Sequence, residues 1–407
     1  MAEADELLRR KYWELLDGGD VAITSDYERW RELKRLVIVQ GLPRDDASGS
    51  GSSLRGRVWK CLLGVERDVD MTKYEALVGR GASHCDGDIR NDTFRTFRGD
   101  SEFAQRVPEA KLVRLLNVFI NELGSDPGEE KKEEGEQVAR DGNLPSIRYV
   151  QGMNVLCAPL LYVLPEPDAY HTFCQLIVRH CPHYMAPQLK GVEKGCALVD
   201  KCLETLDPDL YQHLLKRGIT ARIYALPLIL SLFACVPPLH ELLRVWDVLF
   251  AVGVHFVVVL AVAHTVLLRE QLLELDMDLM KVLSLRCVPP LQSDLLISVA
   301  LQLLHRLPDD LLYEIVRHPF ANPDVPTSLP FHPETISAIM TQIQKQQQQQ
   351  TNASSQSPRS ASSCRGSSSK NVLGAGRAAR STPSTPRSTP RSESTLVAGQ
   401  TRPPWKI

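Results

Sequence analysis

The sequence predicts an all-α protein, and three observations support that fold class. Between residues 144 and 319, one apolar-rich helical segment follows another. Proline-containing breaks separate the segments, at LPEPD, HCPHYMAPQ, LDPD, VPP and RLPDD. No stretch alternates apolar and polar residues convincingly enough for a strand. The chain has 407 residues, of which 43% are hydrophobic, and this is enough apolar material for a large helical core.

Residues 1–40 carry two amphipathic helical patterns, which we interpret as an N-terminal helical extension. The second pattern ends at GLP and places these apolar side chains near helical spacing: Tyr27, Trp30, Leu33, Leu36 and Val37. A Gly/Ser-rich loop is predicted at residues 44–53. Helical patterning restarts at LRGRVWKCLLG, where Gly64 is the predicted end of the helix and one face carries Leu54, Val58 and Leu62.

The predicted main domain spans residues 41–345 and contains a charged insertion at 124–143, which lacks apolar periodicity and is expected at the surface. Residues 346–407 are rich in Gln, Ser, Thr, Pro and Arg and are predicted to form a disordered tail. From Thr351 onward the chain contains nine Lys and Arg but a single acid, Glu393, so this part carries a net charge of +8. Because the whole chain has a net charge of −2, residues 1–350 carry −10. No basic stripe interleaved with aromatics is present there, so nucleic acid is not an expected partner.

Two apolar stretches, Val248–Leu268 and Ile223–Leu239, admit two interpretations: buried core helices or membrane spans. Charges close to both ends of the first stretch and prolines within the second favour buried helices. The N-terminus lacks the apolar run of a signal peptide. Ten cysteines without a C-x-x-C pair suit reduced thiols. We therefore expect a cytoplasmic protein with no transmembrane segment.

Motifs for binding a nucleotide, a catalytic metal or a nucleophile are missing: the P-loop, the Rossmann glycine pattern, H-E-x-x-H and G-x-S-x-G. The protein is therefore not expected to hold a cofactor of its own. RHCPHYM offers His180, Cys181 and His183, but a fourth metal ligand at matching spacing is missing. We expect no metal site, and packed or capping residues in a proline-rich turn instead. His255 and His264 lie in apolar runs and are expected to be core residues.

One arginine and one glutamine remain, Arg95 in IRNDTFRTF and Gln151 in RYVQGMN. A guanidinium is always charged and binds phosphate oxygens with two parallel hydrogen bonds. An arginine supplied to another protein's GTP accelerates phosphoryl transfer by roughly 10³ to 10⁵. A glutamine can accept a hydrogen bond from the attacking water and donate one to phosphate. Together the two residues suit a protein that acts on the GTP of a partner.

The motifs at these positions resemble those of the TBC (Rab-GAP) domain family. The family pattern I-x-x-D-x-x-R followed by Y-x-Q stands here as Ile89, Asp92, Arg95, Tyr149 and Gln151. Two further family motifs flank them in the expected order, LRGRVW upstream and RVWDVLFAVG downstream, and they contain Trp59, Trp246 and Asp247. The resemblance covers roughly residues 41–320.

The resemblance implies a TBC-type multi-helical domain that activates a Ras-like or Rab-like small GTPase. It implies that Arg95 is an arginine finger and Gln151 a glutamine finger, and that the GTP and Mg²⁺ belong to the GTPase. Support of the fingers or contact with the GTPase is implied for Ile89, Asp92, Tyr149, Gly152 and Asn154. Trp59, Trp246 and Asp247 are expected to be structural, with Asp247 pairing with or capping a nearby group.

SLRGRVWKCLLGV, IRNDTFRTF and YVQGMNVLCAPLLYV are more similar to the yeast mitotic-exit and septation-initiation regulators within that family. This similarity implies a negative regulator of mitotic exit that works with a dedicated scaffold partner at the spindle pole body or centrosome. The chain departs from that branch in its charged insertion and its long tail. In the tail, Thr382, Thr385 and Thr389 each precede proline and are predicted phosphorylation sites.

Each residue also has a plainer interpretation when it is taken alone. Asp92 can cap a helix instead of orienting Arg95, Arg95 can be a solvated surface charge, and Gln151 can be a loop residue before a helix. Three functions therefore stay open: an active GTPase-activating protein, in mitotic exit or in vesicle trafficking as a Rab-GAP; a TBC scaffold without activity; and a membrane protein.

Overall fold

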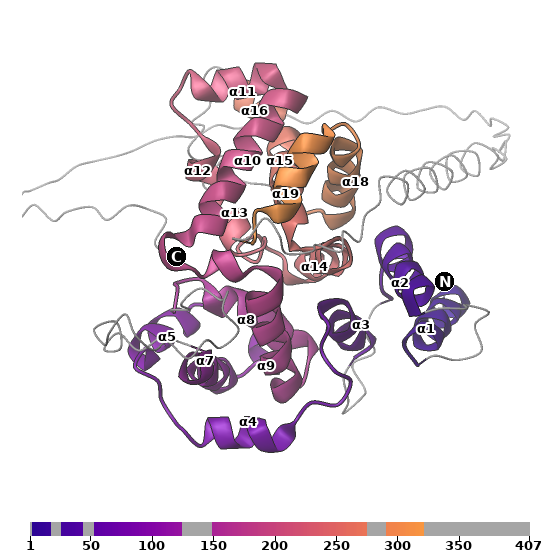
Figure 1. Ribbon diagram of the computed structural model, residues 1–407, viewed down its shortest axis with the longest axis vertical. Helices are drawn as coiled ribbons and strands as arrows, with labels where there is room; N and C mark the ends of the chain where they lie inside the picture. The colour runs from indigo at the N-terminus through magenta and orange to yellow at the C-terminus, as the bar shows by residue number, and fades with distance from the viewer. Residues whose placement is uncertain (1, 18–25, 44–52, 124–148, 275–289, 321–407) are drawn as a thin grey trace, which may run out of the picture. The chain divides into compact units, whose positions relative to one another are not determined.

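The computed structural model describes residues 2–17, 26–43, 53–123, 149–274 and 290–320. Every regular element in these ranges is helical and none is a strand, so the predicted all-α class is confirmed (Figure 1). The chain divides into two units, Met1–Lys345 and Gln346–Ile407, and all described residues belong to the first.

Several sequence predictions fall outside the described residues. These are the charged insertion at 124–143, the tail at 346–407 and the three threonines Thr382, Thr385 and Thr389. They stay predictions, as does the division into an extension, a main domain and a tail.

The helices that precede residue 124 are short, except for two near the N-terminus and one at the end of this part. In chain order they are α1 (Ala2–Asp17), α2 (Asp26–Gln40), α3 (Leu54–Leu63), α4 (Met71–Val78), α5 (Asp86–Thr93), α6 (Ser101–Arg106) and α7 (Glu109–Leu123).

The helices that follow residue 148 carry most of the buried apolar side chains. They are α8 (Met153–Val163), α9 (Glu166–Gln175), η2 (Leu176–His180), η3 (Pro182–Tyr184), η4 (Pro187–Leu189), α10 (Lys190–Leu206), α11 (Pro208–Leu215), α12 (Ala221–Tyr224), α13 (Leu226–Leu230), α14 (Leu239–Val252), η5 (Val254–Phe256), α15 (Val257–Leu267), α16 (Arg269–Leu273), α18 (Ser293–Leu304) and α19 (Asp309–Arg317).

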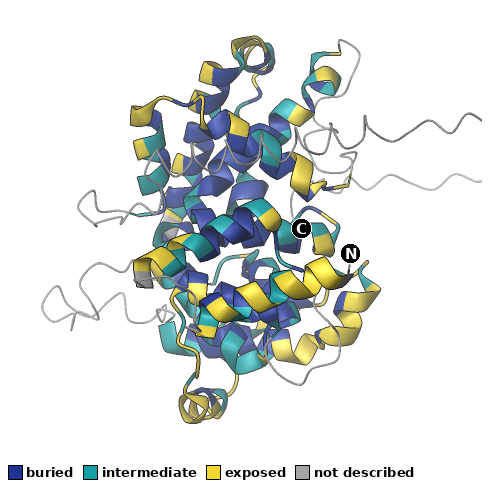
Figure 2. Ribbon diagram, turned by 90° about the vertical axis from the view of Figure 1, so that its right-hand side faces the viewer, coloured by how far each residue is buried: buried dark blue, intermediate teal, exposed yellow. Residues whose placement is uncertain are grey.

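The N-terminal helices α1 and α2 pack against α3 and α14, while the outer face of α1 is exposed (Figure 2). The Tyr12 hydroxyl donates a hydrogen bond to the Gly41 carbonyl at 2.8 Å. Arg244 on α14 donates to the carbonyls of Val37 and Ile38 at 2.9 and 3.1 Å. Carbonyls in the last turn of a helix lack intrahelical partners, and a cationic side chain satisfies them favourably.

One residue of the predicted apolar face of α2 is exposed. Tyr27 lies in the first turn of the helix and faces solvent, whereas Leu33, Leu36 and Val37 are buried. The prediction was wrong for Tyr27 because the buried residues of α2 lie only from Leu33 onward. Helical spacing alone does not show where along its length a helix meets its neighbours.

Helix α3 begins and ends with local signals that the sequence carries. The Ser53 side chain accepts a hydrogen bond from the Gly56 backbone N–H at 3.0 Å and caps the helix N-terminus. Gly64 ends the helix with φ of +72°, as predicted, in the left-handed region that glycine enters without strain. The predicted apolar face is buried through Leu54, Val58 and Leu62.

The longest apolar stretch forms two buried helices rather than one. Gly253, with φ of +126° and ψ of 150°, ends α14, and the short η5 precedes α15. Helix α15 packs against α10 and α18, so the interpretation of Val248–Leu268 as buried core is confirmed (Figure 1). None of the helices in the described ranges combines the length and the apolar character required to cross a bilayer.

Candidate functional site

The candidate site begins at the end of α5. Asp86 and Asp88 occupy the first turn of this helix, where negative charge is favourable. Ile89 is fully buried, and α5 packs against α7 and α8. Arg95 lies in the turn that follows the helix, and Phe97 in the same turn has φ of +47°. The turn is therefore held in a backbone conformation that a bulky residue adopts only under strain.

The Asp92 carboxylate connects the two predicted finger motifs. One of its oxygens accepts a hydrogen bond from Arg95 Nη2 at 2.5 Å, and the other accepts from the Tyr149 hydroxyl at 3.0 Å. Asp92 is buried, whereas the Arg95 side chain is 31% exposed. The carboxylate therefore binds the guanidinium group itself, and the arginine side chain stays partly exposed to solvent.

The capping interpretation of Asp92 is wrong in this structure. Asp92 is the last residue but one of α5 and lies at no helix N-terminus. The next helix, α6, is capped instead by Asp100, whose side chain accepts from the Phe103 N–H. Of the two interpretations that the sequence left open, orientation of Arg95 is the one that the geometry matches.

Asn154, in the first turn of α8, forms hydrogen bonds to the turn that contains Arg95. Its Nδ2 atom donates to Thr96 Oγ1 at 2.8 Å and to the Asp92 carbonyl at 3.3 Å. Thr96 in turn donates from Oγ1 to the same carbonyl at 3.1 Å. Asn154 and Thr96 are both buried, so these bonds are shielded from competition with water. Sequence reasoning assigned no role to Thr96.

Gln151 lies in the turn that precedes α8 and is exposed. Gly152 follows it with φ of +110° and ψ of −12° and occupies the N-cap position of the helix. The Met153 N–H donates to the Val150 carbonyl at 3.0 Å and closes the turn. A Cβ added to Gly152 would meet the Leu230 side chain at an ordinary 3.9 Å, so backbone conformation rather than space requires glycine.

The electrostatics keep the supporting Tyr149 hydroxyl protonated. Burial and the nearby Asp92 charge raise the pKa of the Tyr149 hydroxyl well above its usual value. Tyr149 therefore remains a hydrogen-bond donor at all physiological pH values. The result is a partly exposed cation, held by the buried Asp92, and an exposed amide on a second turn that Tyr149 links to the same carboxylate. Such a pair can bind an oxyanion and a water molecule that approach from outside.

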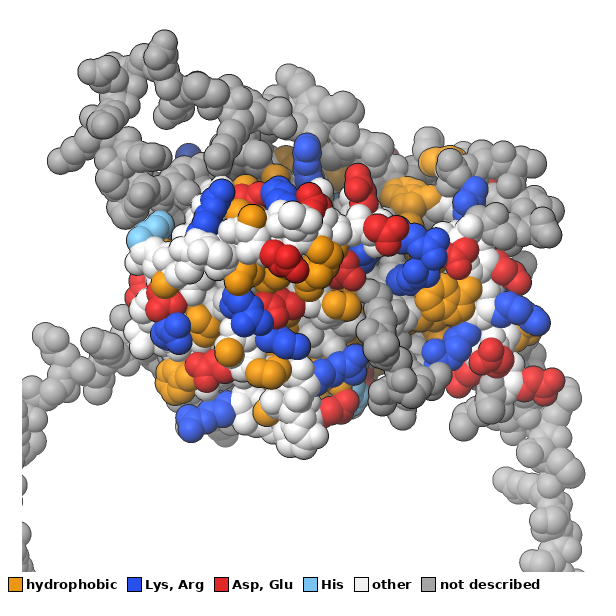
Figure 3. Space-filling model, turned by 90° about the horizontal axis from the view of Figure 1, so that it is seen from below, with side chains coloured by type: hydrophobic (Ala, Val, Ile, Leu, Met, Phe, Trp, Pro, Cys, Tyr) orange, Lys and Arg blue, Asp and Glu red, His pale blue; other side chains and the backbone are white. Residues whose placement is uncertain are grey.

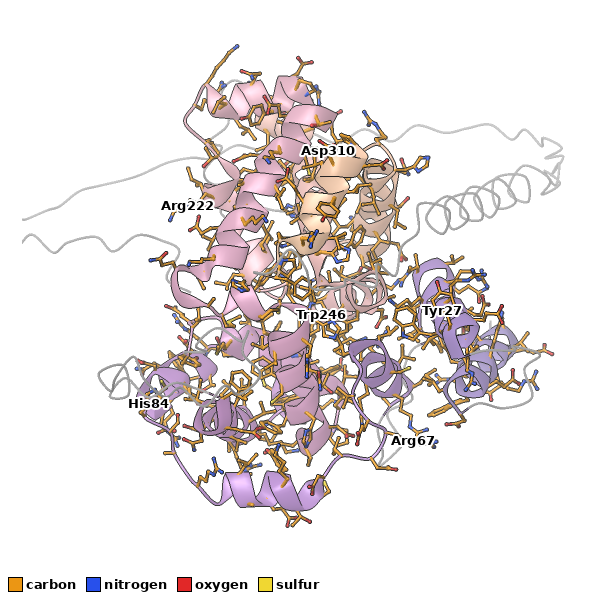
Figure 4. All side chains as sticks on the ribbon, in the orientation of Figure 1. Tyr27, Arg67, His84, Arg222, Trp246 and Asp310 are labelled. Carbon is orange, nitrogen blue, oxygen red and sulfur yellow. The ribbon has the colours of Figure 1, made fainter. Side chains whose placement is uncertain are left out.

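A second polar cluster links α3 to α14. Asp247 accepts hydrogen bonds from Trp59 Nε1 at 2.8 Å and from Arg55 Nε at 3.0 Å. Burial raises the pKa of the fully buried Asp247 carboxyl, and the Arg55 guanidinium opposes that shift. Trp246 is also fully buried, inside the molecule, 5.7 Å from the Trp59 ring (Figure 4). Asp247 thus pairs with a nearby group, and the cluster is structural.

Polar groups of the histidine-rich segment around η3 contact backbone carbonyls. His180 Nε2 lies 3.1 Å from the Leu63 carbonyl, and Cys181 is buried with its Sγ 3.2 Å from the Leu176 carbonyl. His183 donates its backbone N–H to the Pro319 carbonyl. Throughout the ranges that the structure describes, no three His, Cys, Asp or Glu residues gather closely enough to hold a metal ion.

The structure brings together residues from both sides of the undescribed segment 124–148. Asp92, Arg95, Tyr149 and Asn154 meet through hydrogen bonds, while Trp59, Trp246 and Asp247 form the separate cluster at α3 and α14. Arg55 was missed as the partner of Asp247. The LRGRVW motif, which contains both Arg55 and Trp59, was the signal that could have revealed it.

The comparisons with known proteins agree with this architecture. The Rab-GTPase-TBC domain family model matches residues 141–273, a range that includes Gln151 but not Arg95. Cell division control protein 16 of Schizosaccharomyces pombe is 37% identical over 70% of this chain and 87% of its own length. Mitotic check point protein BUB2 of Saccharomyces cerevisiae is 33% identical over 72% of this chain and 92% of its own length.

The chain therefore belongs to the Rab-GTPase-TBC domain family. A crystal structure of the Chlamydomonas flagellar RabGAP TBC domain shows a similar fold, with a TM-score of 0.51 and 20% identity over 73% of this chain and 95% of that domain.

Proposed function

We propose that this protein stimulates GTP hydrolysis by a Ras-like or Rab-like small GTPase, with Arg95 and Gln151 supplied to the nucleotide of the partner. One observation carries the proposal: a buried carboxylate, Asp92, holds the partly exposed Arg95 and also the Tyr149 that precedes Gln151 by two residues. Membership of the Rab-GTPase-TBC family supports a small GTPase as the partner.

The chemistry assigned to each finger follows from its functional group. The Arg95 guanidinium neutralises the charge that grows on the transferring and leaving phosphate oxygens. The Gln151 amide orients the attacking water, because it can accept and donate hydrogen bonds without adding charge. GTP and Mg²⁺ come with the GTPase, so the proposal requires no cofactor on this chain. The protein is an activator that completes the catalytic site of its partner.

The process in which it acts is proposed from its relatives. The names of the two yeast proteins refer to cell division control and to a mitotic check point, and each is similar to this chain over more than two thirds of its own length. We place this protein in negative regulation of mitotic exit or septation. It would be recruited, with a scaffold partner, to the spindle pole body or centrosome, and phosphorylation of Thr382, Thr385 and Thr389 would regulate that recruitment.

Single-turnover hydrolysis of GTP by a panel of purified small GTPases tests the proposal. The assay is run with and without an added scaffold protein. We expect the protein to stimulate GTP hydrolysis by a Ras-like GTPase of the mitotic-exit type more than hydrolysis by the vesicle-traffic Rabs. Strong stimulation of several Rabs alone would assign the protein to vesicle trafficking. If it binds GTPases but accelerates none of them, the protein is a TBC scaffold without activity.

A further inference from the structure

Phe94 is exposed at the point where the chain would meet its partner. It directly precedes Arg95, caps the C-terminus of α5, and is 54% exposed. Within the part of the chain that the structure describes, it is the only phenylalanine in the exposed class. Phe97, three residues later, packs instead against Phe103 with the ring centroids 5.1 Å apart.

The local backbone explains why the two phenylalanines face different surroundings. Thr96, between them, is buried and tied to Asn154 at 2.8 Å, while Phe97 takes φ of +47°. The Phe97 ring is thereby directed to the core and Phe94 is left outside with Arg95. Strain of this kind persists only where the surrounding structure fixes it, and Asn154 and Phe103 supply that here.

We infer that Phe94 is an apolar anchor for the GTPase, and that it contacts the surface that borders the nucleotide pocket of the partner. The inference rests on the proposed function and adds a residue that recognises the partner rather than one that acts on the nucleotide. Consecutive Cα atoms are about 3.8 Å apart. When Arg95 reaches the phosphates, Phe94 therefore cannot be remote from the protein surface around them.

The chemistry of the contact follows from the side chain and its neighbour. An exposed aromatic ring loses little conformational entropy on binding and buries a large apolar area, which is typical of the residues that dominate interface energy. The Arg98 guanidinium lies 5.9 Å from the Phe94 ring centroid, at the outer limit for an interaction with the ring. The matching surface on the GTPase is thus expected to be apolar, with polar groups at its rim.

The chain offers a closely matched control on α19. Tyr313 is 56% exposed, and the Arg317 guanidinium lies 4.5 Å from its ring centroid, four residues further along as Arg98 is from Phe94. The two sites are well separated, since His84, just before α5, and Asp310, on α19, lie far apart in Figure 4. A general effect of removing an exposed aromatic residue would appear in both variants.

The experiment measures single-turnover hydrolysis by a GTP-loaded small GTPase that responds to the wild-type protein, over a range of concentrations of each variant. Phe94→Ala is expected to raise the half-saturating concentration about 10-fold or more and to leave the maximal rate close to wild type. Phe94→Leu should recover most of the affinity, and Tyr313→Ala should change neither quantity. Arg95→Ala, measured in parallel, should lower the maximal rate instead.

The outcomes separate the inference from the function on which it rests. An unchanged half-saturating concentration for Phe94→Ala, together with loss of activity in Arg95→Ala, overturns the anchor and keeps the proposed function. Full activity of Arg95→Ala overturns the proposed function itself. Thermal unfolding of Phe94→Ala is the remaining check: a melting temperature well below that of Tyr313→Ala would show that the chain itself covers the ring, and would overturn the inference.

Discussion

The Tyr149 hydroxyl donates a hydrogen bond to the Asp92 carboxylate at 3.0 Å, although the two residues are 57 positions apart in the sequence. The second oxygen of the same carboxylate accepts from Arg95. The position of Arg95 therefore depends on the segment that carries Gln151, and a change in either turn affects both.

Removal of the guanidinium should abolish most of the stimulated hydrolysis. Arg95→Ala is expected to lower the maximal rate by about 10³-fold or more, because the charge that grows on the transferring and leaving oxygens would lose the guanidinium that neutralises it. Arg95→Lys should restore little, since an ammonium cannot bind two oxygens in parallel. Single-turnover hydrolysis gives the rates. Arg90→Ala is the control, because Arg90 lies on the preceding helix α5 and pairs with Asp86. Near wild-type stimulation by Arg95→Ala would mean that the arginine mechanism is wrong.

The Tyr149 hydroxyl should affect the rate by positioning Arg95 through Asp92, and not by contacting the nucleotide. Tyr149→Phe leaves Asp92 with one hydrogen-bond partner fewer, and the maximal rate is expected to fall about 10-fold, which corresponds to the loss of one bond to a charged group. The half-saturating concentration should change little. Combined with Arg95→Ala, the substitution should cause no further loss, because both act on one arrangement.

The control for Tyr149 is Tyr162→Phe on α8, where the hydroxyl bonds to Glu102 and not to the site. An equal loss of rate in this variant, or a fully additive loss in the Tyr149 and Arg95 double variant, would show that Tyr149 does not act by positioning Arg95.

Gly152 should tolerate no side chain. Gly152→Ala forces an L-residue to φ of +110° and is expected to lower the free energy of unfolding by about 1–2 kcal/mol and to reduce activity by moving Gln151. Gly87 provides the opposite case, since it lies inside α5 with no atom within 4 Å of an added Cβ. Gly87→Ala should raise the free energy of unfolding by about 0.5–1 kcal/mol. Denaturant unfolding measures both, and equal stability of the two variants would refute the backbone argument.

Buried histidines should make the fold sensitive to acid. His318 accepts from Tyr184 through Nε2 at 2.7 Å and donates from Nδ1 to the Ile315 carbonyl at 2.6 Å, so the ring is neutral. Burial lowers the pKa of His318 from 6.5 to about 4. Between these values the unfolded chain binds a proton that the folded chain does not. Stability is therefore complete above the unfolded pKa and is lost as the pH falls toward 4.

For each histidine whose pKa is lowered by burial, the free energy of unfolding is expected to fall by about 1.4 kcal/mol per pH unit between the folded and unfolded pKa values. The lowered pKa values of His255, to about 3, and His264, to about 4, act in the same direction. Denaturant unfolding between pH 7.5 and pH 5 gives the slope of the free energy of unfolding against pH. His318→Phe should be less stable at every pH but show a shallower slope. His240→Gln, at an exposed position, should keep the wild-type slope, and an unchanged slope in His318→Phe would contradict the assignment.

Much of the fold could be predicted because local signals determine it. Gly64 ends α3 as expected, and the predominantly apolar composition of Val248–Leu268 predicts the largely buried helices that the structure shows. The break at Gly253 is visible in the sequence only as a single glycine, so the division into α14 and α15 was not predicted. The exposed position of Tyr27 depends on contacts between helices, which periodicity does not show.

The candidate site was predicted as two motifs but not as one network. Asp92 and Arg95 are only three residues apart, so their contact is local and predictable. The bonds from Asn154 to Thr96 and from Arg55 to Asp247 join segments 58 and 192 positions apart, and no local rule specifies them. The same holds for the strain at Phe97, because a positive φ at a phenylalanine arises only from the surrounding packing.

The distribution of charge on the face drawn in Figure 3 does not indicate a binding site. On the face seen from below in Figure 3, Lys and Arg side chains are interspersed with Asp and Glu, and apolar side chains occur between them. Charge alone therefore does not point to a binding site on that face. Recognition by this protein is expected to depend on individual side chains such as Phe94 and Arg95.

The pairing of Arg55 with Asp247 has a consequence for how the protein is made. During translation, α3 emerges from the ribosome almost two hundred residues before α14. Until α14 has emerged, Arg55 and Trp59 therefore lack the Asp247 carboxylate to which they donate hydrogen bonds. The amino-terminal half of the nascent chain thus cannot reach its final state until the second half emerges. A message truncated before residue 247 would yield a polypeptide with exposed aromatic surface, which chaperones and proteases are suited to remove.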